Sequence, residues 1–404
     1  MTLRISENVR NLEPSATLAV AARARELREA GRDIIDLGAG EPDFPTPGFI
    51  ADAAIAAIRA GHTRYTAAPG IVPLRQAIAR DMARRHGKTV DAAGIIVTAG
   101  AKQALFNAIF TLFGPGDRVI VPAPYWTSYP ALIQIARAEP VFVTGAETRG
   151  FKVTPADLDQ VYDERVRGLI LNSPSNPTGA VYSLEELAAV VRWARERDVW
   201  VISDEIYGRI CYVGDRAPGL LDLDPAPLDH AVIIDGTSKT FSMTGWRIGY
   251  SYSTPELALR MSALQSHITS NATTPAQYAA LAAYSADENQ AAEVRAMVDT
   301  FRKRRDLVVE RFRALLPGVE FVSPEGAFYL FFRIDRFFDA DTPDSIALCR
   351  ALIENAGVAV VPGAAFGDDR YARISFAASE QALNEGIRRI AEALGSTAGQ
   401  EAGR

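Results

Sequence analysis

Short β-branched runs alternate with helical stretches over residues 95–252, and this alternation limits the possible folds more than any other feature of the chain. Strands that alternate with helices are typical of an α/β domain with a largely parallel sheet. The predicted strands span residues 95–97, 118–121, 140–143, 168–171, 200–203, 231–235 and 248–252. Helical patterns lie between them over 102–113, 126–136 and 184–197, the last opened by a capping box at Ser183 and Glu186.

The pattern changes after a long periodic stretch over residues 290–316, which predicts a helix running between two domains. In the segments beyond it, short strands are separated by helices in an order that predicts the α+β layout of a smaller domain. Its expected strands span 319–322, 327–332, 358–361 and 373–376, with helices over 345–355 and 380–394.

The composition excludes several classes of protein. Apolar residues make up 48% and charged residues 23% of the 404 residues, which excludes a disordered or fibrous chain. A net charge of −6 argues against nucleic acid as the main partner. No apolar run approaches the roughly 20 residues that span a bilayer, and no signal-peptide pattern opens the chain, so we expect a cytoplasmic protein without a membrane partner. The spacing of the two cysteines and four histidines predicts no disulfide framework and no metal site.

Two strand-to-helix or strand-to-loop junctions are candidate binding sites. Residues 98–103, TAGAKQ, place a glycine at the turn and Lys102 in the first helical turn, where backbone N–H groups attract anions. Such junctions are common, so this one predicts either a phosphate site or an ordinary turn. Residues 171–179, LNSPSNPTG, predict a β-turn, or a loop that points amides at a ligand from the carboxyl edge of the sheet.

Charged residues follow two further apolar strands. In SDEIY, residues 203–207, Asp204 either caps a helix or faces a cation where α/β proteins bind ligands. Lys239 lies among small hydroxyl residues after another apolar run, and a partly buried lysine loses its proton readily and can act as a Schiff-base nucleophile. Arg247, eight residues further on, is a fixed cation suited to phosphate.

Together these segments meet the requirements of one cofactor. Pyridoxal phosphate needs a lysine for attachment, an acid at its pyridine nitrogen, donors to its phenolic oxygen, a phosphate cup and an aromatic face. The chain supplies, in order, the 98–103 turn, Trp126, Asn176, Asp204, Tyr207, Lys239 and Arg247.

Recognisable motifs extend over nearly the whole chain: PSAT at 14–17, LGAGEPDF at 37–44, RYTAAPG at 64–70, PYWTSYP at 124–130, NSPSNPTGA at 172–180, SDEIY at 203–207, SKTFSMTGWRIGY at 238–250, GAFY at 326–329 and ARISFA at 372–377. With them the chain resembles the class I aminotransferases of the aspartate aminotransferase family, in particular the bacterial aspartate/prephenate subgroup. The resemblance implies fold type I, an α/β large domain with a mostly parallel seven-stranded sheet plus a smaller α+β domain. It also implies an N-terminal segment, 1–45, associated with the small domain, a cofactor-binding large domain, 46–295, and a small C-terminal domain, 296–404.

The resemblance also implies roles for individual residues. The catalytic residues would be Lys239, which attaches the cofactor and shuttles a proton, Asp204 at the pyridine nitrogen, and Tyr207 at the phenolic oxygen. Tyr65 would reach the phosphate of a neighbouring subunit, which implies a homodimer with shared active sites. The implied cofactor-binding set is Gly100, Ala101, Lys102, Trp126, Asn176, Asp204, Tyr207, Ser238, Lys239, Arg247 and Tyr65. The implied substrate-binding set is Gly40, Trp126, Asn176, Arg373 and Lys102. From the residues alone, a core aromatic remains the alternative for Trp126, and a surface arginine is the favoured interpretation of Arg373.

The activity implied is transfer of the amino group of aspartate, or a similar amino acid, to 2-oxoglutarate. Alternatives are an aminotransferase for neutral or aromatic amino acids, a lyase on the same scaffold, and a cofactor-dependent sensor, for which no DNA-binding segment is expected before residue 37.

Two departures from the family pattern matter. Gly236 replaces a hydroxyl residue, which leaves Thr237 or Ser238 as the substitute. Glu13 stands before Pro14, where an acid would repel a second substrate carboxylate and argue against prephenate.

Overall fold

A seven-stranded sheet forms the larger part of the computed structural model, which describes residues 5–10, 12–14 and 16–401. Ser15 of the PSAT motif lies outside the described residues. The strand order is β2-β8-β7-β6-β5-β3-β4, and only β8 runs antiparallel to its neighbours. The predicted mostly parallel sheet of seven strands is therefore confirmed. The strands are β2 (Ile95–Thr98), β3 (Arg118–Ala123), β4 (Glu139–Thr144), β5 (Val166–Asn172), β6 (Trp200–Asp204), β7 (Ala231–Gly236) and β8 (Gly249–Tyr252).

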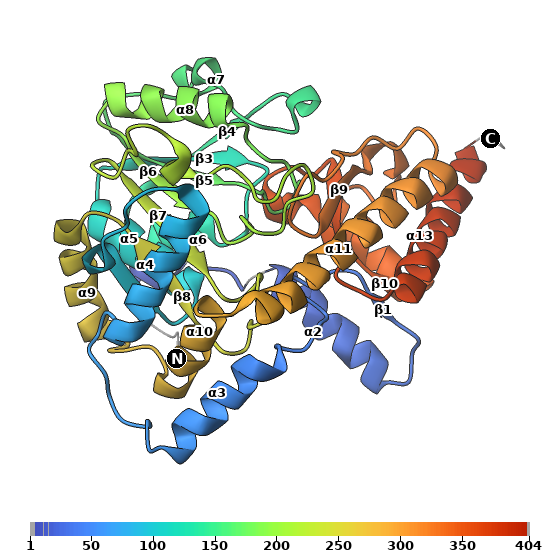
Figure 1. Ribbon diagram of the computed structural model, residues 1–404. Coiled ribbons are helices and arrows are strands. Elements are labelled where there is room, and N and C mark those ends of the chain that lie inside the picture. The colour runs from blue at the N-terminus through green and yellow to red at the C-terminus, as the bar shows by residue number, and fades with distance from the viewer. Residues whose placement is uncertain (1–4, 11, 15, 402–404) are drawn as a thin grey trace.

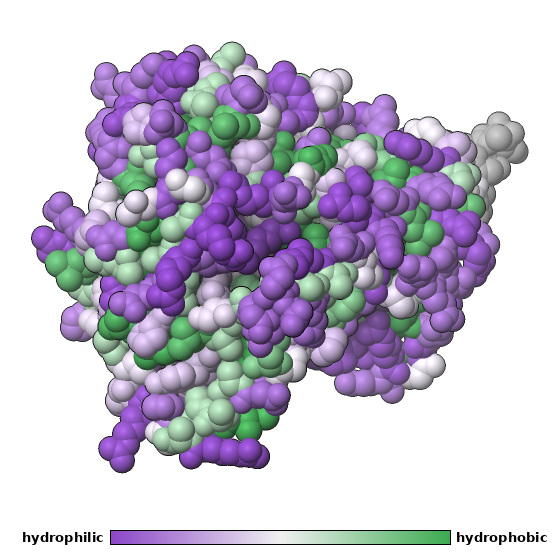
Figure 2. All heavy atoms as spheres, viewed as in Figure 1, coloured by the Kyte–Doolittle hydropathy of each residue, from purple (hydrophilic) through white to green (hydrophobic). Residues whose placement is uncertain are grey.

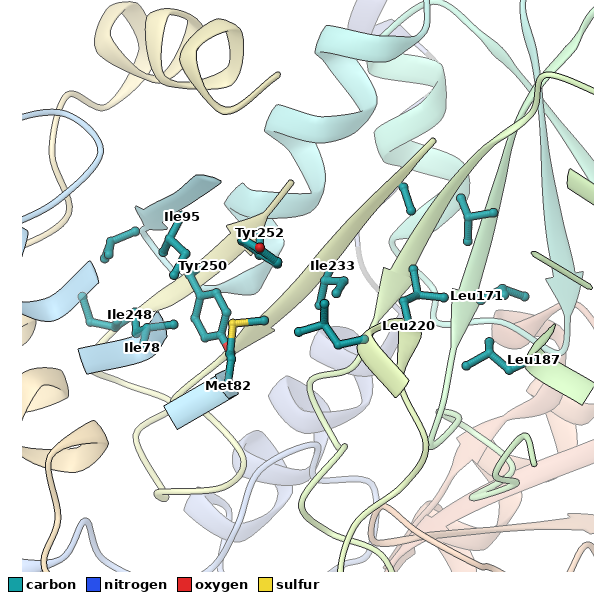
Figure 3. Packing of buried hydrophobic residues seen from close by; sticks show 14 of the residues in the cluster. Ile78, Met82, Ile95, Leu171, Leu187, Leu220, Ile233, Ile248, Tyr250 and Tyr252 are labelled. Carbon is teal, nitrogen blue, oxygen red and sulfur yellow. The ribbon is translucent and has the colours of Figure 1, made fainter. Parts of the chain in front are cut away.

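Helices cover both faces of this sheet because its central strands are apolar on both sides (Figure 1). On β7, Ile233 packs with residues of α4 and α8 on one face, as Figure 3 shows, while Val232 and Ile234 pack with α5, α6 and α9 on the other. The capping box predicted at Ser183 is present at the start of α8. The helices of this part are α3 (Gly48–Arg59), α4 (Val72–His86), α5 (Ala101–Leu112), α6 (Tyr129–Ile135), α7 (Pro155–Asp159), α8 (Leu184–Glu196), α9 (Pro255–Ile268) and α10 (Thr274–Tyr284).

A smaller part combines both ends of the chain. Its antiparallel sheet has the order β11-β12-β9, and a second, parallel pair joins β1 from the N-terminal segment to β10. The long helix α11 runs from the large sheet to this part, where it packs beside α13 (Figure 1). The elements are α1 (Glu7–Arg10), α2 (Ala16–Glu29), β1 (Ile35–Asp36), α11 (Glu288–Leu315), β9 (Tyr329–Arg333), α12 (Ser345–Ala351) with a π-helical continuation over Leu352–Ala356, β10 (Val358–Ala359), β11 (Val361–Pro362), β12 (Tyr371–Ser375) and α13 (Glu380–Glu401). Short 3₁₀ helices also occur between the other elements, at Ala92–Gly94, Glu147–Arg149, Leu220–Asp222, Asp335–Phe337 and Gly363–Phe366.

Three predicted elements differ from the structure. The strand expected over 319–322 does not form, because the segment lies along the edge of β9 with too few backbone bonds, among them Arg333 N–H to the Glu320 carbonyl at 2.8 Å. The strand expected over 358–361 splits into β10 and β11, which pair with different partners. The helix expected from residue 126 begins at Tyr129, with Pro130 in its first turn, where a missing N–H has no cost.

None of the described helices is both long and apolar enough to cross a membrane.

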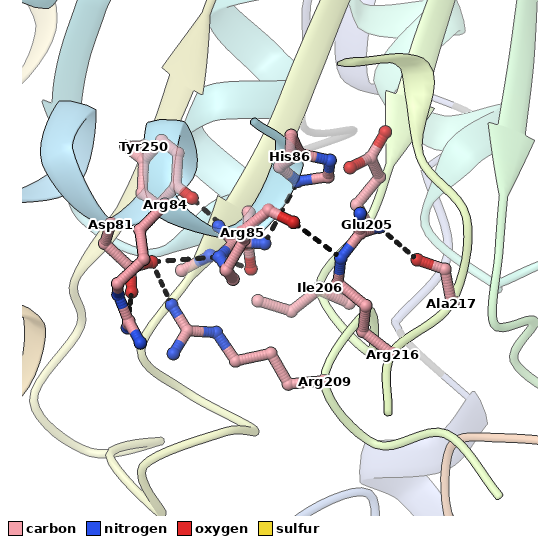
Figure 4. Close-up of polar contacts among 12 residues, drawn as sticks. Asp81, Arg84, Arg85, His86, Glu205, Ile206, Arg209, Arg216, Ala217 and Tyr250 are labelled. Atoms are coloured by element: carbon pink, nitrogen blue, oxygen red, sulfur yellow. Dashed lines mark hydrogen bonds and ion pairs between the residues drawn. The ribbon is translucent and has the colours of Figure 1, made fainter. Parts of the chain in front are cut away.

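A buried cluster of charges fastens α4 to the loop after β6 (Figure 4). Asp81 is 4% exposed and accepts hydrogen bonds from Arg84 at 2.9 Å, Arg85 at 3.0 Å and Arg209. Burial acts to raise the pKa of Asp81, but Arg209 and Arg85 outweigh it and the pKa is lowered. Nη2 of Arg85 also lies 3.8 Å from Oδ2 of Asp235, the residue four positions before Lys239. The cluster therefore supports the strand end that carries the predicted nucleophile.

We expect Asp81→Ala to lower the free energy of unfolding by about 3–5 kcal/mol, because Arg85 would stay buried with one carboxylate partner fewer. Urea unfolding at a fixed protein concentration measures this. Arg84→Ala is the matched control: its side chain is 73% exposed, so losing that pair should cost less than about 1 kcal/mol. Equal losses in the two variants would show that the buried cluster contributes no more than a surface ion pair.

Candidate active site

A cavity of about 470 Å³ opens where the carboxyl ends of β5, β6 and β7 meet the start of α5 and the small sheet. Figure 2 shows the molecule hollowed between its two parts, with hydrophilic residues around the hollow. Parallel sheets in α/β folds commonly bind ligands at this edge. Eleven of the predicted site residues line the cavity: Gly40, Ala101, Lys102, Trp126, Asn176, Asp204, Tyr207, Ser238, Lys239, Arg247 and Arg373.

The two remaining predicted residues lie elsewhere. Gly100 sits directly behind the cavity wall, where a Cβ atom would lie 2.4 Å from Nη2 of Arg247. Its φ of +82° is also one that side chains rarely adopt, so glycine is required at this turn on two grounds. Tyr65 is 91% exposed and does not line the cavity of its own chain.

One end of the cavity is built for an anion. It combines the first turn of α5 with Lys102 and Arg247, and no described carboxylate forms an ion pair with either cation. Burial lowers the pKa of Lys102, and the charge of Arg247 lowers it further. The Lys102 ammonium lies 5.0 Å from the centroid of the Trp126 ring, which places that aromatic at the cavity wall. Free N–H groups at a helix start together with two unpaired cations fit anionic groups such as a phosphate and a carboxylate.

Thr237 and Ser238, the two candidates for the hydroxyl that Gly236 lacks, lie in different surroundings. Thr237 is fully buried, and its Oγ1 donates to the Ile248 carbonyl at 3.0 Å. Ser238 lines the cavity instead. Of the two alternatives, only Ser238 is placed to meet a bound group.

Asp204 is a buried acid aimed into the cavity from the end of β6. It is 4% exposed and accepts hydrogen bonds from the Tyr129 hydroxyl at 2.7 Å and from the Ile206 N–H at 3.2 Å. Residues 206–209 form a turn rather than a helix, so the helix-cap alternative is wrong. Burial raises the pKa of Asp204 to about 6, and the nearby charge of Lys239 acts in the opposite direction. Such an acid can hold a proton on a basic ring nitrogen.

Lys239 faces Asp204 across the same cavity. Its Nζ donates to the Gly40 carbonyl at 2.5 Å and lies 6.0 Å from the centroid of the Tyr207 ring. Burial lowers the pKa of Lys239 to about 8, with Glu41 opposing the shift and Arg373 adding to it. About a tenth of this amine is therefore uncharged and nucleophilic at pH 7, far more than for an ordinary lysine.

Arg373 forms the opposite end of the cavity, and the surface alternative for it is wrong. It is 1% exposed and donates to Oδ1 of Asn176 at 2.9 Å and to the Gly38 carbonyl at 2.8 Å. Its guanidinium lies 4.3 Å from the centroid of the Tyr329 ring. Its Nε is buried without a hydrogen-bond partner, and no described carboxylate pairs with the side chain. A buried arginine in this state suits the carboxylate of a small ligand.

Several cavity residues were missed in the sequence. Tyr129 holds Asp204, and the hydroxyl of Tyr329 lies 2.7 Å from that of Tyr207. Both tyrosines occur in motifs already recognised, PYWTSYP and GAFY, so hydroxyl-bearing aromatics within those motifs were the available signal. Leu18 of α2 was also missed, and it lines the cavity beside Thr17 of the recognised PSAT motif. Glu13, in contrast, is exposed and lines a separate cavity beside α12.

Comparisons with known proteins agree with this geometry. The family model "Aminotransferase class I and II" matches residues 32–390. The aspartate aminotransferase of Geobacillus stearothermophilus is 42% identical over 96% of this chain and 98% of its own. The aspartate/prephenate aminotransferase of Nitrosomonas europaea is 40% identical over 97% of this chain and 100% of its own. The structure of the Thermus thermophilus aspartate aminotransferase with maleate superposes with a TM-score of 0.91 at 39% identity, covering 97% of this chain and 100% of that one.

The lowered pKa of Lys239 leads to a pH prediction for the cofactor-free protein. Modification of Lys239 by an amine-selective reagent should reach half its maximal rate near pH 8, because only the neutral amine reacts, instead of near the usual lysine value of 10.5. Peptide mass spectrometry after short labelling measures it. In the urea-unfolded chain, the same peptide should show the usual value. An unchanged midpoint in the folded protein would contradict the burial of this amine.

Proposed function

This chain belongs to the class I and II aminotransferase family, enzymes that depend on pyridoxal phosphate, and we propose that it transfers the amino group of aspartate to 2-oxoglutarate. Its fold is fold type I of the pyridoxal-phosphate enzymes, as the sequence predicted. The residues in the cavity fit the cofactor: the unpaired Arg247 and the backbone N–H groups at the start of α5 suit its phosphate, and buried Asp204 suits its ring nitrogen.

The cofactor, when bound, withdraws electrons from the Cα–H bond of the amino acid. Asp204 would maintain that withdrawal by keeping a proton on the ring nitrogen, and Tyr129 holds the Asp204 carboxylate in place. Lys239 would attach the cofactor and would carry the proton from the substrate Cα to C4′ of the cofactor. Asn176 and Tyr207 would hold the phenolic oxygen, and Trp126 would hold the ring.

Three cationic side chains without carboxylate partners carry the proposal for an acidic substrate. Four cations line the cavity among the described residues, and Lys239 is the nucleophile. Arg247 meets the phosphate, while Arg373 and Gly40 meet the α-carboxylate that all amino acids share. Lys102 then remains for the second carboxylate of aspartate or glutamate. Glu13 lines a different cavity, so its position gives no argument against a second carboxylate.

We also propose a cytoplasmic homodimer with shared active sites. Tyr65 supports it, because this tyrosine of the family's RYTAAPG motif has a side chain that is 91% exposed and can reach the phosphate of a second subunit. Related exposed apolar side chains on the same part include Ile58 and Val72. Burial of such side chains between subunits would remove apolar surface from water.

The substrate proposal is tested by comparing amino acids in two variants. Lys102→Ala should lower kcat/KM for aspartate at least tenfold more than for alanine, which corresponds to a lost charge pair of about 1.4 kcal/mol. Arg373→Lys should lower kcat/KM for both together, since a point charge cannot reproduce a two-pronged contact. Equal losses for aspartate and alanine in Lys102→Ala, or a wild type that ignores acidic amino acids, would favour an aminotransferase of neutral or aromatic amino acids. Release of ammonia or pyruvate without glutamate formation would favour a lyase.

The shared site is tested with hybrid dimers. We expect Lys239→Ala to be inactive and Tyr65→Phe to bind pyridoxal phosphate more weakly. Mixing the two after partial unfolding should restore one site in which Lys239 of one subunit and Tyr65 of the other are both intact. Activity at a cofactor concentration too low for Tyr65→Phe alone measures this. Hybrids no more active than the parental mixture would contradict a contribution of Tyr65 across the interface.

A further inference from the structure

Residues 38–46, the 38–46 loop, connect the small part of the molecule to the cavity wall. The Gly38 carbonyl accepts a hydrogen bond from Arg373, and the Gly40 carbonyl accepts one from Lys239. The Glu41 carboxylate accepts from the Thr244 hydroxyl at 2.7 Å, and Thr46 donates to the Ser242 carbonyl at 2.7 Å. The loop therefore contacts both the α-carboxylate arginine and the segment that carries the nucleophile.

One contact of the loop leaves the cavity altogether. Nη1 of Arg304, on α11, donates to Oδ1 of Asp43 at 2.6 Å. The Arg304 side chain is 10% exposed and its guanidinium lies 5.1 Å from the centroid of the Phe44 ring. Phe44 packs edge-on against Phe301 of the same helix, with centroids 5.3 Å apart. Neither Arg304 nor Asp43 is among the described residues that line the cavity.

We propose that Arg304 is a positioning residue for substrate binding, acting through Asp43 on the 38–46 loop. The inference rests on the proposed role of Gly40 and Arg373 as the α-carboxylate site. The contacts at Gly38 and Gly40 join backbone carbonyls to Arg373 and Lys239, which must also meet ligand, so these two contacts alone do not fix the part of the loop that lines the cavity. The Arg304–Asp43 pair is charge-assisted, partly buried and packed between aromatic rings, which makes it a geometrically fixed anchor.

A fixed anchor has a specific consequence for the reaction. Small misplacements of groups that hold a substrate are costly, because the reacting geometry tolerates little displacement. Releasing the loop would displace Gly40 and remove one acceptor from Arg373 at the same time. The loss should fall on binding of the α-carboxylate, and it should be the same for every amino acid, since all carry that group.

The test uses Arg304→Gln, Asp43→Asn and the double variant, with Arg304→Lys as the conservative change. Arg295→Gln is the matched control, because Arg295 lies on the same helix and pairs with Glu288 at the surface. Steady-state kinetics with aspartate and alanine give KM and kcat. Hydrogen–deuterium exchange of peptides covering residues 37–46, in the holoenzyme without substrate, gives a readout independent of turnover.

We expect KM to rise about tenfold for both amino acids in each single variant, with kcat changed less, and no further rise in the double variant. Exchange in the 38–46 loop should increase, and Arg304→Lys should recover part of both effects. Unchanged loop exchange, a rise confined to aspartate, additive losses in the double variant, or the same effect in Arg295→Gln would each overturn the proposal. Failure of the aspartate proposal alone would leave the alanine measurement and the exchange unaffected.

Discussion

Unneutralised positive charge is the constraint around which this molecule is organised. Arg373 is almost fully buried, the Lys102 ammonium is partly desolvated although the residue is exposed overall, and neither forms an ion pair with a described carboxylate. A buried charge is costly unless it is hydrogen-bonded, and the fold meets part of that cost with neutral groups: the amide of Asn176 and the Gly38 carbonyl at Arg373, and the ring of Trp126 at Lys102. The remainder of the cost is offset only by an anionic ligand, so the unsatisfied charge is itself a source of affinity.

The degree of pairing distinguishes two kinds of buried charge in this protein, those that are fully compensated and those that are only partly compensated. Asp81, on helix α4, is surrounded by three arginines and is fully compensated, which suits a group that only has to hold elements together. At the carboxyl edge of the sheet, Asp204 and Lys239 are only partly compensated, and burial moves both pKa values toward neutrality. Groups poised in this way can exchange protons near pH 7, which fully paired groups cannot.

How far the sequence predicted this arrangement depended on the range of the interactions. The seven strands of the large sheet were predicted because local runs such as Val232–Ile234 are apolar on both faces. The edge segment 319–322 was predicted wrongly because a strand at an edge depends on its partner, which periodicity does not reveal. The burial of Arg373 could not be predicted from its own short strand, because it depends on rings from other elements. Tyr329, in β9, and Phe366, in a 3₁₀ turn, both pack on the guanidinium. Likewise, composition could not choose between Thr237 and Ser238, which differ only in where the backbone aims them.

The two-residue pairing of β1 with β10 has a consequence for how the protein is made. Ile35 and Asp36 find their strand partners only at Val358 and Ala359, near the other end of the chain, and the 38–46 loop begins directly after β1. Contacts between such distant segments form late, because closing a long loop must precede the gain from the contact. During synthesis, the strands of the large sheet and the segment that carries Lys239 leave the ribosome well before β10. The nascent protein therefore holds its nucleophile in a site that still lacks the wall containing Gly40. The wall that contains Gly40 can close only once the last quarter of the chain has folded, which makes completion of the chain the final step in assembling the pocket.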